Sequence, residues 1–197
     1  HVIEPFAPPE SWTLHRSFDF GYSKPYSVGW WACDYDGRLY RILELYGCMP
    51  HEADAGVRQT PDEIFLKIAE IERDHPWLAG RHIYGVADPA IWDASRGISI
   101  AEVGEKYGIY FDRGDNKRIP GWMQFHYRLS FDENGIPMVY IFKNCRDFIR
   151  TVPLLSYSRT LCEDIDTALE DHIADESRYL FMSRPIPPRK GCARSRR

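Results

Sequence analysis

The stretch LHRSFDFGYSKPYSVGWWACDYDGRLYRILELY, residues 14–46, contains three strand-like apolar segments joined by two short turns. We expect strands at residues 14–21, 26–33 and 39–46, because the turn signals SKP and DYDG separate them. Sequential strands with short connections usually pair with their neighbours. The stretch therefore predicts an antiparallel three-strand meander.

The period of the apolar pattern changes after this meander. The sequence TPDE from Thr60 is a helix start, with threonine as N-cap, proline at the first helical position and glutamate at the third, and the helix should end near Pro76. The other predicted elements are strands at residues 81–87, 108–111 and 138–142 and helices at residues 99–107, 119–129, 145–150 and 164–182. This order predicts an α/β fold, in which parallel strands join the antiparallel meander in a mixed sheet and helices flank both faces.

The composition is that of one globular domain. With 197 residues, 44% of them hydrophobic, the chain can bury a sizeable core and is not disordered. The formal net charge of −4 gives no overall basic character, so nucleic-acid binding would need a local basic patch. No apolar run is long enough to span a bilayer, so we expect no membrane partner.

Cysteine and histidine spacing argues against several common metal and disulfide frameworks. The five cysteines form no CxxC pair, and the seven histidines form no HxxxH or HxH pair. We therefore expect neither a disulfide framework nor a zinc ribbon, and we interpret the cysteines as reduced thiols of an intracellular protein.

Four aspartates are the candidate catalytic and metal-binding residues. Asp19 lies within the first predicted strand, and Asp88 ends a later one. Asp171 opens a helix-like run, and Asp175 follows four residues later on the same face. A carboxylate at the end of a buried strand is costly unless something compensates it, and several converging carboxylates suggest a divalent metal ion. Carboxylate ligands favour Mg²⁺ or Mn²⁺ over zinc, so the sequence predicts metal-dependent chemistry on an anionic substrate.

Each of these residues also has a purely structural interpretation. The dipeptide at Asp88 is a common turn opener, and Asp171 could simply favour a helix N-terminus by its charge. Asp175 could form a solvated ion pair with a neighbouring basic residue. Glu44 ends a predicted strand and could be an outer-shell ligand, although we favour a surface carboxylate.

Basic residues near the acidic positions are candidates for DNA binding. Arg113, Lys117 and Arg118 cluster in a loop that contains glycine and asparagine, and Lys24 follows closely after Asp19. Phosphate contacts from such side chains would position a duplex without reading its sequence. The alternative is an ordinary solvated loop.

The chain divides into three predicted regions. Residues 1–13 are rich in proline and are interpreted as a linker remnant, residues 14–183 as the domain, and residues 184–197 as a disordered basic tail.

Several stretches together resemble the nuclease domain of the large terminase subunit of tailed double-stranded DNA bacteriophages. The resemblance spans most of the chain and implies a ribonuclease H-like fold, which agrees with the order of strands and helices. The stretches that carry it are DFGYSKPYSV from Asp19, DYDGRLY from Asp34, ELY from Glu44, VADPA from Val86, KRIPGWM from Lys117 and DHIADESRY from Asp171.

The resemblance implies a metal-dependent endonuclease that cuts concatemeric viral DNA during packaging in the host cell cytoplasm. It also implies portal protein and the small terminase subunit as partners, and an ATPase motor domain that precedes the nuclease. No GxxxxGK[ST] phosphate loop occurs here, so we expect that the motor is missing from this chain. Phosphodiester cleavage by two metal ions about 4 Å apart would use Asp19 as the bridging ligand, Asp88 on one ion and Asp171 on the other, with or without Asp175.

One departure leaves the third ligand open. Members of this family often carry two adjacent aspartates at the start of the last helix, whereas His172 follows Asp171 here. The third ligand is therefore Asp171 alone or Asp171 together with Asp175. Two other functions stay open as well, a junction resolvase or transposase-type nuclease of the same fold and a non-catalytic docking domain for DNA or portal protein.

Overall fold

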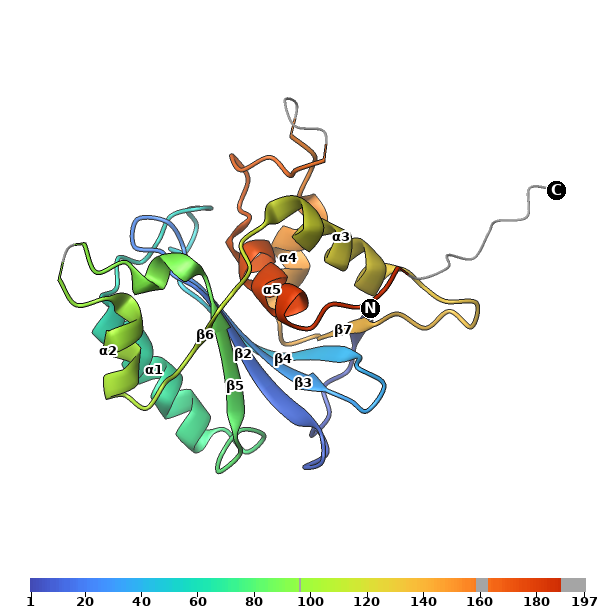
Figure 1. Ribbon diagram of the computed structural model, residues 1–197, viewed down its shortest axis with the longest axis horizontal. Helices are drawn as coiled ribbons and strands as arrows, with labels where there is room; N and C mark the ends of the chain where they lie inside the picture. Colours follow the sequence, from blue (N-terminus) through green and yellow to red (C-terminus); the bar gives the residue numbers. More distant parts are fainter. Residues whose placement is uncertain (96, 159–162, 189–197) are drawn as a thin grey trace.

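The computed structural model describes residues 1–95, 97–158 and 163–188, and in these residues seven strands form one sheet in the order β1-β7-β4-β3-β2-β5-β6 (Figure 1). The strands are β1 (Val2–Ile3), β2 (Thr13–Asp19), β3 (Ser27–Cys33), β4 (Leu39–Tyr46), β5 (Ile83–Ala87), β6 (Asp112–Arg113) and β7 (Val139–Phe142). The helices are α1 (Pro61–Asp74), α2 (Ile100–Lys106), α3 (Arg118–Leu129), α4 (Arg146–Thr151) and α5 (His172–Ser183), with the short 3-10 helices η1 (Pro89–Trp92) and η2 (Val152–Leu154).

The predicted antiparallel meander is confirmed. Strands β2, β3 and β4 pair in sequence, and the register places Asp19 of β2 opposite Ser27 of β3. Strand β5 joins β2 in parallel, and β7 joins β4 in parallel. The sheet is therefore mixed, as predicted, with the meander at its centre and parallel strands on both sides.

Helices cover both faces of the sheet, with α1 and α2 on one face and α3, α4 and α5 on the other (Figure 1). Successive residues of β2 point to opposite faces. Phe18 therefore packs against Phe65 of α1, with 5.5 Å between ring centroids, while Ser17 donates a hydrogen bond to Glu176 of α5. Asp19 shares the face of Ser17, so its side chain belongs to the α5 side of the sheet.

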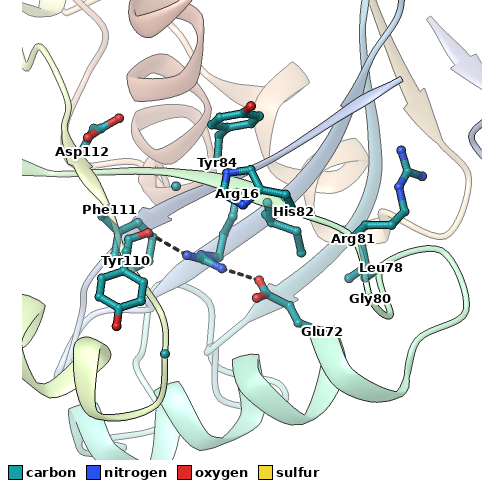
Figure 2. Close-up of a pocket in the computed structure, with 13 residues that line it drawn as sticks. Arg16, Glu72, Leu78, Gly80, Arg81, His82, Tyr84, Tyr110, Phe111 and Asp112 are labelled. Carbon is teal, nitrogen blue, oxygen red and sulfur yellow. Dashed lines mark hydrogen bonds and ion pairs between the residues drawn. The ribbon is translucent and has the colours of Figure 1, made fainter. Parts of the chain in front are cut away.

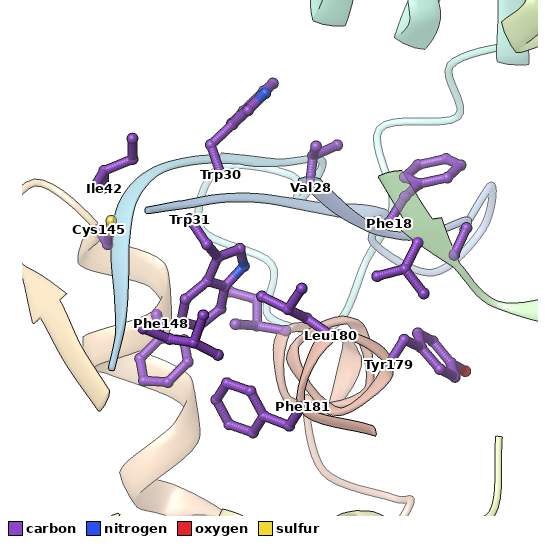
Figure 3. Packing of buried hydrophobic residues seen from close by; sticks show 14 of the residues in the cluster. Phe18, Val28, Trp30, Trp31, Ile42, Cys145, Phe148, Tyr179, Leu180 and Phe181 are labelled. Atoms are coloured by element: carbon purple, nitrogen blue, oxygen red, sulfur yellow. The ribbon is translucent and has the colours of Figure 1, made fainter. Parts of the chain in front are cut away.

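The tryptophan pair of β3 shows the same alternation (Figure 3). Trp30 points toward α1, where its indole N–H donates to Glu72 over 2.8 Å. Trp31 points toward α5 and packs edge-on against Phe181, with 5.5 Å between ring centroids. Both indoles are buried, so the sheet has a hydrophobic core on each face.

Local capping signals set the helix starts that were predicted most accurately. Thr60 accepts a hydrogen bond from the backbone N–H of Glu63, whose side chain accepts one from the backbone N–H of Thr60. Ser99 and Glu102 form the same capping box at the start of α2. These reciprocal bonds satisfy backbone donors that a helix N-terminus leaves free, which is why the pattern is readable from sequence.

Two predicted elements were wrong. A strand was expected at residues 108–111, but β6 is Asp112–Arg113, because it pairs with the last two residues of β5. A helix was expected from residue 164, but α5 begins at His172. Ile165 pairs instead with Tyr157 in an isolated β-bridge, and the Asp164 side chain accepts the backbone N–H of Ile165.

The segment predicted as a linker, residues 1–13, packs against the domain. Strand β1 pairs in parallel with β7, and Phe6 contacts the rings of Trp12, Tyr40 and Phe142. These contacts place β1 at the edge of the sheet and pack Phe6 against the domain.

The predicted tail begins in contact with the domain. The backbone of Ile186 exchanges two hydrogen bonds with the Gln124 side chain of α3, over 2.8 and 3.1 Å. Residues 189–197 of the predicted tail lie outside the described residues. Among the residues that the structure describes, no helix has the length and apolar character needed to cross a membrane.

Candidate active site

Two of the predicted aspartates lie side by side because their strands are parallel neighbours. Asp19 is the last residue of β2, and Asp88 follows the last residue of β5. The register pairs Phe18 with Ala87, and the backbone N–H of Asp88 donates to the Phe18 carbonyl over 3.1 Å. The backbone itself therefore fixes both carboxylates at the carboxyl edge of the sheet, where open α/β sheets usually place their sites.

Asp171 and Asp175 reach the same edge from α5. Asp171 is at the N-cap position of α5, is buried and makes no side-chain capping bond. The backbone N–H of Asp175 donates to the Asp171 carbonyl over 2.9 Å, so Asp175 lies one helical turn further on. Because Asp171 caps nothing with its side chain, helix capping does not account for its burial.

The electrostatics show that these carboxylates influence one another. The pKa of Asp19 is raised to about 7, mainly by burial and also by the charges of Asp175 and Asp88, against the lowering effect of His172. Burial and the charge of Asp175 raise the pKa of Asp171 to about 6. The structure thus brings the four predicted aspartates into one acidic cluster, whose charge is unfavourable without a positive partner.

Asp88 has a structural role in addition to its place in this cluster. Its side chain accepts the backbone N–H of Ala90 over 2.9 Å and caps the 3-10 helix η1. The turn-opening interpretation of the sequence is therefore correct for Asp88, and it does not conflict with a place in the site.

His172 supplies one of the positive partners of the cluster. Its Nε2 lies 2.9 Å from Oδ1 of Asp54, and its Nδ1 lies 3.7 Å from Oδ2 of Asp19. Burial acts to lower the pKa of His172, but Asp19 and Asp54 raise it to about 9. His172 therefore carries a positive charge and faces Asp19.

Arg118 supplies a second positive partner. Its guanidinium lies 3.0 Å from Asp164, 3.0 Å from Asp175 and 3.6 Å from Asp171. Trp122, one helical turn later, donates its indole N–H to Asp164 over 2.7 Å. Arg118 thus connects the start of α3 to the acidic start of α5, and its three carboxylate contacts direct it into the cluster.

The other predicted DNA-binding residues lie at the surface around the cluster. Lys24 forms an ion pair with Asp54, and its side chain is 58% exposed. Arg113 pairs in β6 with Ala87 and lies 4.9 Å from the centroid of Trp92. Lys117 is 73% exposed beside Asp115. Arg113 is exposed as well, so all three side chains are open to solvent.

Glu44 is neither a surface carboxylate nor a member of the acidic cluster. Its side chain accepts the backbone N–H groups of Asp147 and Phe148 over 2.7 and 3.2 Å and pairs with Arg41 over 3.3 Å. It therefore stabilises the start of α4, and the sequence interpretation was wrong because that contact joins residues more than one hundred positions apart.

Glu176 was not singled out from the sequence, yet it anchors the helix that carries Asp171 and Asp175. It is fully buried, and it accepts hydrogen bonds from Ser27, over 3.0 Å, and from Arg41, over 2.7 Å. Gly29 makes this approach possible, because a Cβ there would lie 2.4 Å from the Glu176 carboxylate. The sequence signal for Glu176 was its spacing, three residues after Ile173 and four before Leu180, which places it on the apolar face of α5.

The donor chemistry of the acidic cluster fits Mg²⁺ or Mn²⁺, since both ions prefer hard carboxylate oxygens. Burial is the main cause of the raised pKa values of Asp19 and Asp171, and a divalent cation would offset the repulsion between carboxylates that adds to it. In the described residues, however, no group of three His, Cys, Asp or Glu side chains is arranged to hold a metal ion. His172 and Arg118 balance the negative charge in this arrangement.

A cavity of about 530 Å³ lies away from the acidic cluster, beside the start of β5 (Figure 2). Arg16 lies in its wall, where it donates to Glu72 and to the Tyr110 carbonyl over 2.5 and 2.8 Å. None of the predicted site residues lines this cavity. Glu72 neutralises Arg16 in this wall, and the cavity holds none of the four aspartates, so we place the site at the acidic cluster.

We expect Arg118→Met to destabilise the protein more at pH 8 than at pH 5. The substitution removes the countercharge of three carboxylates, and at pH 5 protonation of Asp171, with its pKa of about 6, relieves part of the repulsion. The expected loss at pH 8 is about 1–3 kcal/mol of unfolding free energy, measured by urea denaturation in EDTA. Arg73→Met is the control, because its ion pair with Asp74 is exposed and contributes little. An equal loss at both pH values would contradict this role of Arg118.

Solved structures of phage large terminases have the same fold as this chain. No protein-family model and no curated protein sequence matches this chain. The nuclease domain of the phage P22 large terminase matches it with a TM-score of 0.69 and 15% identity, over 93% of this chain and 87% of that one. The zinc-bound large terminase nuclease of the thermophilic phage G20c matches with a TM-score of 0.59 and 15% identity, over 91% and 92% of the two chains.

A longer protein matches as well. The large terminase of a second thermophilic bacteriophage, solved in complex with ADP, has a TM-score of 0.71 and 19% identity over 93% of this chain. The match covers 42% of the ADP-bound terminase, so this chain spans about two fifths of that protein's length. These likenesses confirm the ribonuclease H-like fold and the resemblance to phage terminase nuclease domains that the sequence indicated.

Proposed function

We propose that this chain, which has the fold of phage large terminase nuclease domains, is a divalent-metal-dependent DNA endonuclease. The observation that carries the proposal is the acidic cluster at the carboxyl ends of β2 and β5, on that fold. In the proposal, residues 14–183 form the nuclease domain. Its substrate is concatemeric viral double-stranded DNA, which it cuts during genome packaging in the host cell cytoplasm.

The proposed partners follow from the longer relatives. An ATPase motor domain, the portal protein and the small terminase subunit would act with this chain. In support, the ADP-bound terminase that contains a matching region is more than twice as long as this chain. The chain described here contains no phosphate loop, so ATP-driven movement of DNA is not among its own proposed activities.

The proposed reaction is hydrolysis of a phosphodiester bond. Asp19, Asp88 and Asp171, with Asp175, would hold two Mg²⁺ or Mn²⁺ ions, which activate water and neutralise charge on the leaving oxygen when bound. The G20c nuclease was solved with bound zinc, which supports a metal site on this fold. Asp19 is the candidate for the bridging ligand, since the charges of both Asp88 and Asp175 act on its pKa.

The surface around the cluster suits a DNA backbone. Lys24, Arg113 and Lys117 place positive charge at this edge of a protein whose overall charge is −4. Such side chains bind phosphates and hold the duplex in register without reading its bases. Arg118 is instead paired with carboxylates of the acidic cluster, so its main proposed role is to balance their charge.

The proposal is tested by cleavage of supercoiled plasmid in Mn²⁺, Mg²⁺ or EDTA. We expect nicking and linearisation with either metal, none in EDTA, and a loss of about 10²-fold or more in Asp88→Asn. Asparagine at position 88 keeps the turn, since its side-chain oxygen can also accept the Ala90 N–H. Asp93→Asn is the matched control, because the Asp93 side chain accepts the backbone N–H of Ser95 in the same kind of turn. This variant should cleave like wild type.

Two outcomes would overturn the proposal. Cleavage that persists in EDTA would exclude metal dependence. A folded wild-type protein that cleaves with neither metal would instead be a docking domain for DNA or portal protein, and gel-shift binding to DNA would then measure that alternative.

A further inference from the structure

The loop that follows β4, residues 47–58, is fastened to the turn between β2 and β3. The backbone N–H of Gly56 donates to the Ser23 carbonyl over 2.9 Å, and that of Arg58 donates to the Tyr22 carbonyl over 3.2 Å. A Cβ at Gly56 would lie 2.3 Å from the Lys24 carbonyl oxygen, so only glycine allows this contact. The 47–58 loop therefore lies against the turn that directly follows Asp19.

The backbone of the 47–58 loop is unusual. His51, Asp54 and Arg58 have φ values of 65°, 61° and 55°, and they are the non-glycine residues with positive φ in the described part of the chain. Left-handed conformations cost free energy for residues with a side chain, and they concentrate at functional sites. Asp54 is the one of the three whose side chain reaches the acidic cluster through a neighbour.

Asp54 connects the surface of the protein to the buried carboxylate of β2. One of its oxygens pairs with Lys24, and the other lies 2.9 Å from Nε2 of His172. The other ring nitrogen of His172, Nδ1, lies 3.7 Å from Asp19. The four side chains form a continuous chain of opposite charges from Lys24 to Asp19.

We propose that Asp54 is a positioning residue of this site, which holds the His172 imidazole in place against Asp19. The inference rests on the proposed nuclease function. An ionised Asp54 can only accept a hydrogen bond, so Nε2 of His172 must donate, and this fixes which ring nitrogen faces Asp19. A carboxylate that accepts the N–H of one ring nitrogen is a common way in which proteins fix the orientation of an imidazole and the role of its other nitrogen.

The alternative is that Asp54 merely stabilises the 47–58 loop. The two roles differ in their dependence on His172. If Asp54 acts through His172, its removal should have no further effect once His172 is gone. If Asp54 only holds the loop, the two losses should add.

The first test needs neither metal nor DNA. Imidazole N–H signals are recorded by ¹H–¹⁵N NMR in EDTA, and the His172 signal is identified by its absence in His172→Gln. We expect a slowly exchanging Nε2–H signal in wild type and in Asp54→Asn, whose amide oxygen can accept the same bond, and loss of that signal in Asp54→Ala. Glu52→Ala is the matched control, since Glu52 is an exposed carboxylate of the same loop and should keep the signal.

The second test is a double-mutant cycle in the plasmid cleavage assay. We expect Asp54→Ala and His172→Gln each to slow cleavage by about 10–100-fold, with the double variant no slower than His172→Gln alone. Asp54→Asn should recover most of the rate, and Glu52→Ala should cleave like wild type. Urea denaturation of each variant checks that the domain is folded.

The outcomes separate this inference from the proposed function. A protected His172 signal that survives in Asp54→Ala, or additive losses in the cycle, would overturn the role of Asp54. Absence of cleavage by wild-type protein would overturn the nuclease proposal, while the NMR comparison would still show whether Asp54 holds His172.

Discussion

Replacing Asp19 by asparagine is expected to abolish DNA cleavage and, at the same time, to stabilise the metal-free domain above pH 7. Cleavage should fall by about 10³-fold or more, because the transition state would lose several kcal/mol of stabilisation by the metal ions that Asp19 is proposed to hold. The stability gain has a separate origin, the cost of an ionised carboxylate in a buried acidic cluster.

The sign of the pH dependence follows from the raised pKa of Asp19, about 7 in the folded protein against 3.8 for a free aspartate. Between these values the folded state keeps a proton that the unfolded state has released, so rising pH favours unfolding. The full difference corresponds to roughly 4 kcal/mol, and loss of the His172 contact in the variant offsets part of it.

The measurement is urea denaturation in EDTA at pH 5 and pH 8. We expect Asp19→Asn to exceed wild type by about 1–3 kcal/mol of unfolding free energy at pH 8 and by clearly less at pH 5. Asp93→Asn, an exposed turn residue, should show no such difference. A variant less stable than wild type at pH 8 would mean that the His172 contact outweighs the cost of burial.

Breaking the buried ion pair between Arg41 and Glu176 is expected to have the largest effect on folding. Both side chains are fully buried, with 2.7 Å between Arg41 Nη1 and the Glu176 carboxylate. Arg41→Met would leave the Glu176 charge in the core with only neutral donors such as Ser27 and Trp31. Removal of one partner of a buried pair typically costs about 3–5 kcal/mol of unfolding free energy.

The double variant Arg41→Met with Glu176→Gln tests this explanation. Glutamine removes the unpaired charge at nearly the same volume, so we expect the double variant to be more stable than Arg41→Met alone in urea denaturation. Arg73→Met is the control, because the ion pair of Arg73 with Asp74 is exposed and contributes little. A double variant less stable than the single one would show that lost packing, not the stranded charge, causes the effect.

The same pair connects stability to the site. Arg41 holds Glu176, and Glu176 lies next to Asp175 on α5, so the position of the acidic start of this helix depends on a contact with β4. Variants of Arg41 that remain folded are therefore expected to lose cleavage as well.

Much of the fold was predictable because its signals are local. Turn residues delimited the strands of the meander, and β4 was predicted at residues 39–46, where it lies. Capping boxes at Thr60 and Ser99 marked two helix starts. The start of α5 was missed because the residues before it are engaged by α3, through Arg118 and Trp122 on Asp164, which no local pattern reveals.

The candidate site was likewise predictable in part. The residues that carry the negative charge could be predicted from the sequence, because an aspartate in or after an apolar strand is costly and therefore conspicuous, as at Asp19 and Asp88. The groups that balance this charge could not be predicted, because they depend on how distant segments pack together. His172 and Arg118 come to the cluster from separate segments of the chain, and the energy of an ion pair depends on distances that are set when strands and helices pack.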